Sequence, residues 1–86
     1  MRLIHPDYAS FLRTLAGLGP TGNADTDRWR ALLLASEDLL SAAARDDAAA
    51  AKTEIAKATR SVWPDSSKIP SGARASLGVL RVDVRW

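Results

Sequence analysis

Residue types that support catalysis and covalent crosslinking are scarce or missing in this sequence. It has no Cys and a single His among its 86 residues. The absence of Cys excludes a disulfide framework and thiolate metal sites. His5 has no second His or Cys with which to complete a metal site, so we interpret it as a capping or surface residue. The sequence therefore predicts no metal ion and no other cofactor.

A long hydrophobic run is also lacking. No stretch approaches the roughly 18 apolar residues that a membrane-spanning helix needs. Residues 1–19 are interrupted by charged residues and carry no recognisable secretion signal. We therefore expect a cytoplasmic protein without a membrane partner. If a phage encodes the protein, we expect to find it in the host cytoplasm or in the virion.

Large apolar side chains are few. The hydrophobic share is 47%, but 16 of these residues are Ala and only 20 are Val, Ile, Leu, Met or Phe. A chain of this length forms one domain and buries only about 60% of its unfolded surface, so its core is thin. We therefore expect it to gain stability from a second copy of itself or from another protein.

Helical spacing of apolar residues dominates the first 63 residues, which we predict to form a small bundle. The predicted elements are helices over about 6–18, 26–45 and 48–63, a loop over 64–76 and a strand over 77–86. Pro6 suits the first helical position because its missing N–H costs nothing there. Between the second and third helices we favour a break, because Asp46 or Asp47 can cap a new helix. A single helix continuing to Trp63 is the alternative, and it would favour dimerisation.

The last seven residues alternate strictly between apolar and charged side chains. This period of two, with two Val residues, is typical of a β-strand. We therefore predict a mainly α fold: a three-helix bundle with a C-terminal strand. A lone strand leaves backbone groups unpaired, so three pairings stay open. The strand pairs with residues 2–5, with another copy, or with the sheet edge of a partner.

The same segment holds the residues that we predict to bind a partner. They are Leu80, Arg81, Val82, Val84, Arg85 and Trp86. Trp86 is suited to anchor an interface because Trp buries a large area, although packing against the chain's own helices is equally open. On this interpretation, deleting residues 79–86 abolishes assembly and leaves most of the helical content intact.

No arrangement of residues predicts catalysis. The Gly-rich stretch over 17–22 follows a helix instead of a strand and lacks the Lys-Ser/Thr ending of a phosphate loop, so we interpret it as a turn. The Ser residues have no base in a recognisable pattern. Neighbouring acids, such as Glu37 and Asp38, point in different directions on a helix and make no facing carboxylate pair. We therefore predict that the protein is not an enzyme.

Charge is distributed unevenly along the chain. Residues 1–47 have five Arg or Lys and seven Asp or Glu. Residues 48–86 have seven Arg or Lys and three Asp or Glu, so the C-terminal half is mildly basic.

We predict a non-enzymatic protein–protein interaction module. Because the composition resembles that of proteins from high-GC bacteria and their phages, a phage-encoded connector or inhibitor is a specific version of it. The alternative is a nucleic-acid-binding regulator that uses the basic C-terminal half.

Overall fold

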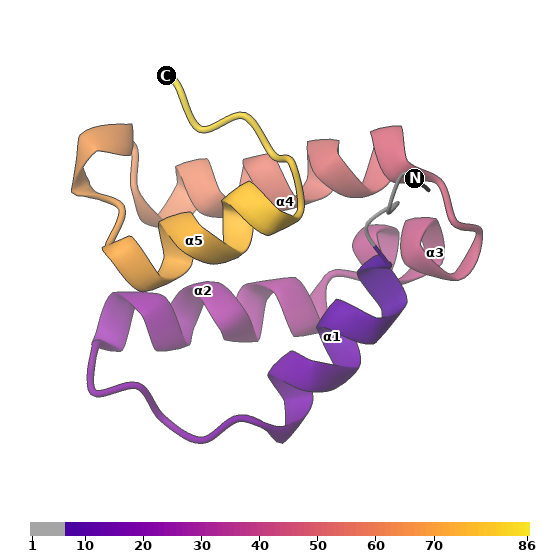
Figure 1. Cartoon of the computed structure of the whole chain (residues 1–86), viewed down its shortest axis with the longest axis horizontal. Helices are drawn as coiled ribbons and strands as arrows, with labels where there is room; N and C mark the ends of the chain where they lie inside the picture. Colours follow the sequence, from indigo (N-terminus) through magenta and orange to yellow (C-terminus); the bar gives the residue numbers. More distant parts are fainter. Residues whose placement is uncertain (1–6) are drawn as a thin grey trace, which may run out of the picture.

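The chain folds as a set of short helices packed around one core. The structure is a computed structural model that describes residues 7–86. In that range the regular elements are α1 (Tyr8–Gly17), α2 (Ala24–Ala35), α3 (Glu37–Ala44), α4 (Ala48–Val62), the 3-10 turn η1 (Ser66–Lys68) and α5 (Ser71–Val79). Helix α4 lies along α2 and contacts α3, while α1 packs against α2 and α3 (Figure 1). The tail, residues 80–86, folds back over α4 and α5 (Figure 1).

The predicted fold class is wrong at the C-terminal end. The described residues contain no strand, and residues 77–79 form the last turn of α5. The predicted loop over 64–76 contains η1 and most of α5. Ala73, Leu77 and Leu80 are buried at helical spacing along this segment. Their burial against the other helices outweighs the poor helix propensity of a stretch with two Gly and two Ser.

Side-chain capping fixes where five of the helical elements begin. In each, a side-chain oxygen of the capping residue accepts a hydrogen bond from a backbone N–H in the first turn, as is usual at helix N-termini. The capping residues are Asp7 for α1, Asn23 for α2, Ser36 for α3, Asp47 for α4 and Asp65 for η1. Much of the negative charge of the protein is therefore used to start helices.

Ser36 divides the segment that the sequence predicted as one helix over 26–45. Its backbone is extended, and its N–H donates to Leu33, the last bond of α2. Its hydroxyl then accepts a hydrogen bond from the N–H of Leu39 at 3.1 Å, which begins α3. Ser hydroxyls compete with helical bonding in this way. Because the chain bends here, α3 reaches both α1 and α4.

A second turn separates α3 from α4 at residues 45–47, where the sequence favoured a break. Asp46 has a positive φ of 54°. The N–H of Asp46 donates to Ala43, and the N–H of Asp47 donates to Ala42. This pair of bonds is a Schellman motif, the common ending of an α-helix. Asp47 also caps α4, so the turn closes one helix and opens the next.

Two tryptophans occupy the centre of the core. The rings of Trp29 and Trp63 lie 5.9 Å apart at 54°, and both side chains are buried. The indole N–H of Trp29 donates to the hydroxyl of Thr59 at 2.9 Å, and that hydroxyl donates to the carbonyl of Ile55. The single buried indole donor of α2 is thereby satisfied, as buried polar groups generally are.

Three sequence predictions lie outside the described residues. They concern the pairing of the tail with residues 2–5, the surface or capping role of His5, and the place of Pro6 at the first helical position.

Candidate interaction surfaces

The tail alternates as predicted between inward and outward side chains, but the surface that it covers belongs to its own chain. Leu80 and Val82 are buried, and Val84 and Trp86 are half-buried. Arg81, Asp83 and Arg85 are exposed. The alternation therefore marks an extended segment packed on helices, not a strand in a sheet.

A tight turn at Arg81 directs the tail back over the bundle. Arg81 has a φ of 61°. Its N–H donates to Gly78, and the N–H of Val82 donates to Leu77 at 3.0 Å. These are again the two bonds of a Schellman motif, with its usual apolar contact between Val82 and Leu77. The left-handed conformation costs a non-Gly residue some free energy, which burial of Leu80 and Val82 offsets.

Side chains of the bundle donate to backbone carbonyls at both ends of the tail. The hydroxyl of Tyr8 donates to the carbonyl of Leu80 at 2.9 Å. The hydroxyl of Ser66 donates to the carbonyl of Trp86 at 2.8 Å, and the indole N–H of Trp86 donates to the carbonyl of Trp63 at 3.1 Å. The tail is therefore held on its own bundle at Leu80 and at Trp86.

Of the six residues predicted to bind a partner, only Arg81 and Arg85 are well exposed. The side chain of Arg85 donates to Asp83 at 3.1 Å. Hydrogen bonds from the side chain and the backbone of Arg85 lower the pKa of Asp83, and the same pairing raises the pKa of Arg85. Any partner that uses Arg85 therefore competes with a local ion pair.

An apolar groove lies between α1, α2 and α3. Its volume is about 330 Å³, and its lining is Ala9, Leu12, Arg13, Ala16, Leu34, Leu40, Ala43 and Ala44. Leu40 forms part of one wall and is 43% exposed. A neighbouring hollow shares Ala16 and Leu34 and extends the apolar surface to Leu18, which is 50% exposed. Isolated exposed leucines are ordinary, but a groove that gathers them is a candidate binding surface.

Charges of both signs lie beside this groove. Arg13 lines it, and its guanidinium donates to the hydroxyl of Ser10 at 2.9 Å. Glu37 and Asp38 stand in the first turn of α3, three and two residues before Leu40. Neither carboxylate has an ion-pair partner among residues 7–86. Glu37 is one helical turn from Leu40 and can share its face, whereas Asp38, two residues before Leu40, points away from it.

Sequence reasoning did not single out this groove. Leu40 belongs to the predicted apolar stripe of the second helix, where a continuous helix would bury it. The bend at Ser36 rotates α3 relative to α2 and leaves Leu40 at the surface. The available signal was Ser36 followed by Glu37, because Ser before acidic residues is typical of a helix N-terminus.

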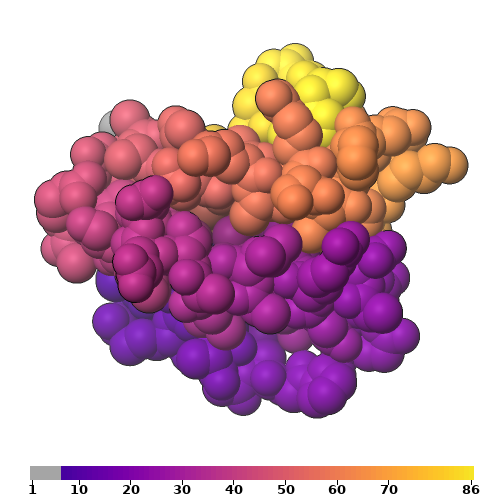
Figure 2. Space-filling view, turned by 180° about the vertical axis from the view of Figure 1, so that it is seen from behind, coloured from indigo at the N-terminus to yellow at the C-terminus, as the bar shows by residue number. Residues whose placement is uncertain are grey.

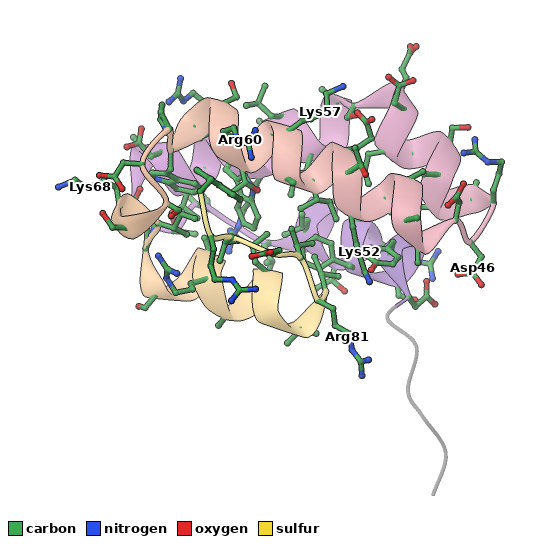
Figure 3. All side chains as sticks on the ribbon, turned by 90° about the horizontal axis from the view of Figure 1, so that it is seen from above. Asp46, Lys52, Lys57, Arg60, Lys68 and Arg81 are labelled. Carbon is green, nitrogen blue, oxygen red and sulfur yellow. The ribbon has the colours of Figure 1, made fainter. Side chains whose placement is uncertain are left out.

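A second hollow lies on the outer side of α4. It has a volume of about 600 Å³ and is lined by Thr53, Ala56, Lys57, Arg60 and Ser61. Lys52, Lys57 and Arg60 all belong to α4, whereas Lys68 lies at the η1 end of the molecule (Figure 3). The C-terminal half, residues 48–86, has seven Arg or Lys residues, and the structure places three of them on α4. Arg74 instead donates to the carbonyl of Ser66 at 2.6 Å.

Arg60 is held over an aromatic ring. Its guanidinium carbon lies 5.2 Å from the centre of the Trp86 ring, within cation–π range. Trp86 is itself fixed by its bonds to Trp63 and Ser66. Arg60 is therefore a positioned cation at the surface of α4.

The described residues show no constellation that points to a reaction. Among residues 7–86, no group of three or more His, Cys, Asp or Glu side chains lies close enough to hold a metal ion. The Gly-rich stretch leads into a turn in which Thr21 donates to Asp27 through its N–H and its hydroxyl. These bonds lower the pKa of Asp27. Its carboxylate therefore braces the loop before α2.

Across the part of the chain that the structure describes, no helix combines the length and apolar character that spanning a membrane requires. In comparisons with known proteins, no protein-family model, curated protein or solved structure matches this chain.

Proposed function

We propose that this protein is a non-enzymatic protein–protein interaction module whose partner is a second copy of itself. The observation that carries the proposal is the groove between α1, α2 and α3, where an exposed leucine and a cation line one apolar surface and Glu37 stands one helical turn before that leucine. The surface is complementary to itself, which is what a two-fold interface requires.

The apolar part of the interface comes from Leu40 and the alanines around it. Leu40 stands on one wall of the groove, and Ala9, Ala16 and Ala44 leave space along its length. In a two-fold pair, Leu40 of each copy enters the groove of the other. Small residues allow the backbones of α1 and α3 to approach, and closing the groove removes Leu40 from water.

The polar part of the interface comes from Arg13 and Glu37. Glu37 and Leu40 are three residues apart on α3 and therefore share a face. When Leu40 enters the groove of the other copy, Glu37 is carried toward the Arg13 that lines it. The two-fold axis repeats this ion pair, so the interface gains two charge contacts that also fix its register.

The size of the molecule is compatible with such an interface. Stable interfaces bury about 1,200–2,000 Å² in total, or roughly 600–1,000 Å² from each copy. The surface of the described chain is 5465 Å². Each copy would therefore cover about 11–18% of this surface. A connector in a phage particle, working in the virion or the host cytoplasm, is a role that suits such a module.

The test is the solution mass, measured by light scattering or sedimentation over a dilution series. We expect a dimer that dissociates on dilution. Leu40→Glu should shift the equilibrium to monomer, because it places a charge in the apolar groove. Leu32→Glu is the matched control. Leu32 is similarly exposed, at 39%, but it lines a different hollow, the one between α2 and α4.

A charge reversal tests the register of the pair. Arg13→Glu should weaken the dimer by opposing Glu37, and Arg13→Glu combined with Glu37→Arg should restore it. A wild-type protein that is monomeric at every concentration would overturn the proposal. So would equal loss of the dimer in Leu32→Glu and Leu40→Glu, because the interface would then not be the groove.

A further inference from the structure

The outer face of α4 carries positive charge that is offset locally by one carboxylate, Glu54, which pairs with Lys57. Most carboxylates of the protein stand at helix N-termini: Asp7, Asp25, Asp27, Glu37, Asp38, Asp47 and Asp65 are capping or first-turn residues. There they offset the positive end of a helix dipole. On α4 itself the only acid is Glu54. The uneven charge seen in the sequence thus becomes an uneven charge in space.

The hollow on α4 combines cations with hydroxyl groups. Lys57 and Arg60 stand at its sides, Thr53 and Ser61 contribute hydroxyls, and Ala56 is small enough to leave the centre open. Lys57 contacts Glu54 at 3.4 Å through a side chain that is 68% exposed, and such surface pairs are weak. The Thr53 hydroxyl already donates to the carbonyl of Ala49, so the donors available to phosphate oxygens are Lys57, Arg60 and Ser61.

Arg60 distinguishes this hollow from a scatter of surface charge. Its stacking over Trp86 reduces its freedom before any ligand binds, so less entropy is lost on contact. Lys52 lies two helical turns before Arg60, roughly 12 Å along the axis, and about 140° around the helix from Lys57. Figure 3 shows Lys52, Lys57 and Arg60 along α4 and Arg81 at the start of the tail.

From this geometry we infer that the outer face of α4 binds the phosphate backbone of a nucleic acid. The hollow holds one phosphate between Lys57 and Arg60, and Lys52 contacts a neighbouring phosphate. The exposed α4 residues beside the cations are Ala49, Thr53 and Ser61, and this face has no Asn or Gln for bidentate reading of base edges. Binding therefore does not depend on base sequence.

This inference is independent of the proposed self-association. In Figure 2, α4 and the tail lie together in the upper part of the molecule, whereas α1 and much of α2 form the lower part. A dimer formed through α1 and α3 leaves the hollow on α4 open, and a pair of such hollows would increase the affinity for a long strand. Failure of one proposal leaves the other standing.

The experiment is a titration of fluorescein-labelled DNA, as a 20-base-pair duplex and as a single strand, with the full chain at several salt concentrations. We expect binding that weakens as salt rises, with a slope of log K against log salt of about −2 to −3 for the duplex. Lys57→Gln with Arg60→Gln should reduce affinity at least tenfold at low salt and make the slope about two units shallower.

A matched double variant separates the site from net charge. Arg28→Gln with Lys68→Gln removes the same two charges from α2 and η1 and should leave affinity and slope nearly unchanged. The fluorescence of Trp86, the half-buried tryptophan beneath Arg60, should change on binding to the wild-type protein.

Three results would overturn the inference. The first is that neither DNA binds at low salt. The second is that the control variant loses as much affinity as the site variant. The third is that polyglutamate binds as tightly as the duplex and competes with it, which would assign the face to an acidic protein. If the protein prefers duplex or single-stranded DNA and the site variant binds both more weakly, the inference is supported. The preference then shows which form of nucleic acid the face binds.

Discussion

The hydroxyl of Tyr8 donates a hydrogen bond of 2.9 Å to the backbone carbonyl of Leu80, 72 residues further along the chain. Tyr8 is the first residue of α1, and Leu80 follows the last turn of α5. Both are buried. The bond thus joins the first described helix to the beginning of the tail inside the core, where neither group has water as an alternative partner.

Tyr8→Phe tests this bond. The substitution keeps the ring but leaves the carbonyl of Leu80 without its donor in a buried place. We expect the free energy of unfolding to fall by about 1–2 kcal/mol, measured by urea denaturation. Unchanged stability would mean that water replaces the hydroxyl and that the two ends are not coupled there.

Thr59→Val tests the polar contact in the centre of the core. It removes the acceptor of the Trp29 indole N–H while conserving shape, so stability should fall by about 1–3 kcal/mol. Thr53→Val is the matched control. Thr53 lies on the same helix and bonds the carbonyl four residues before it, as Thr59 does, but it is exposed. Its replacement should change stability by less than about 0.5 kcal/mol.

Leu80→Ala tests whether the tail belongs to the core. Leu80 is 2% exposed, so the substitution should cost about 2–5 kcal/mol. Its neighbour Val79 is 74% exposed, and Val79→Ala should be nearly neutral. Removal of residues 79–86 should accordingly lower helical content, contrary to the expectation from the sequence. Equal and small effects of the two substitutions would show that the tail is not packed in solution.

Acid should destabilise the protein through its capping carboxylates. Hydrogen bonds from Ser10 lower the pKa of Asp7, bonds from Thr21 lower that of Asp27, and bonds from Ser67 lower that of Asp65. A lowered pKa in the folded state means that the folded state binds the proton less tightly than the unfolded state. The contribution is therefore complete above the ordinary value near 3.8 and is lost as pH falls through the lower folded pKa values.

The measurement is the urea midpoint followed through an acid titration. Asp7→Asn supplies the control, because Asn also caps helices but does not titrate. We expect its midpoint to fall less steeply with acid than that of the wild type. If the urea midpoints of the two proteins fall with pH in parallel, Asp7 does not contribute to the loss of stability in acid.

The sequence was sufficient for helices whose apolar spacing and capping agree. Asp47 caps α4 at the break that the sequence favoured, and α1 begins at Tyr8, two residues after its predicted start, with Asp7 as the cap instead of a first-turn residue. It was insufficient at Ser36, because this residue fits the periodic pattern and nothing nearby is Gly or Pro. The hydroxyl of Ser36 can either bond a carbonyl within a continuous helix or cap a new one. Which of the two occurs depends on the tertiary contacts of α3.

The tail shows a different limit. Alternation indicated that Leu80 and Val82 face one way and Arg81 and Asp83 the other, but it assigned the apolar side to a partner, whereas Leu80 and Val82 are buried on the chain's own helices. It could not tell what satisfies the backbone, because the donors are Tyr8 and Ser66, which lie far away in the sequence. The same distance explains why the groove and the positioned Arg60 were not predicted. Each depends on elements that meet only after folding.

The contact between Tyr8 and Leu80 also sets the order of events during synthesis. Helices α1 to α4 can pair as they leave the ribosome, since their contacts join neighbouring elements. The core stays open on one side until residues 77–82 emerge, because Leu77, Leu80 and Val82 close it. A nascent chain that lacks these residues therefore leaves the hydroxyl of Tyr8 without its acceptor. We expect the chain to resist proteases only once residues 77–82 have packed against the bundle.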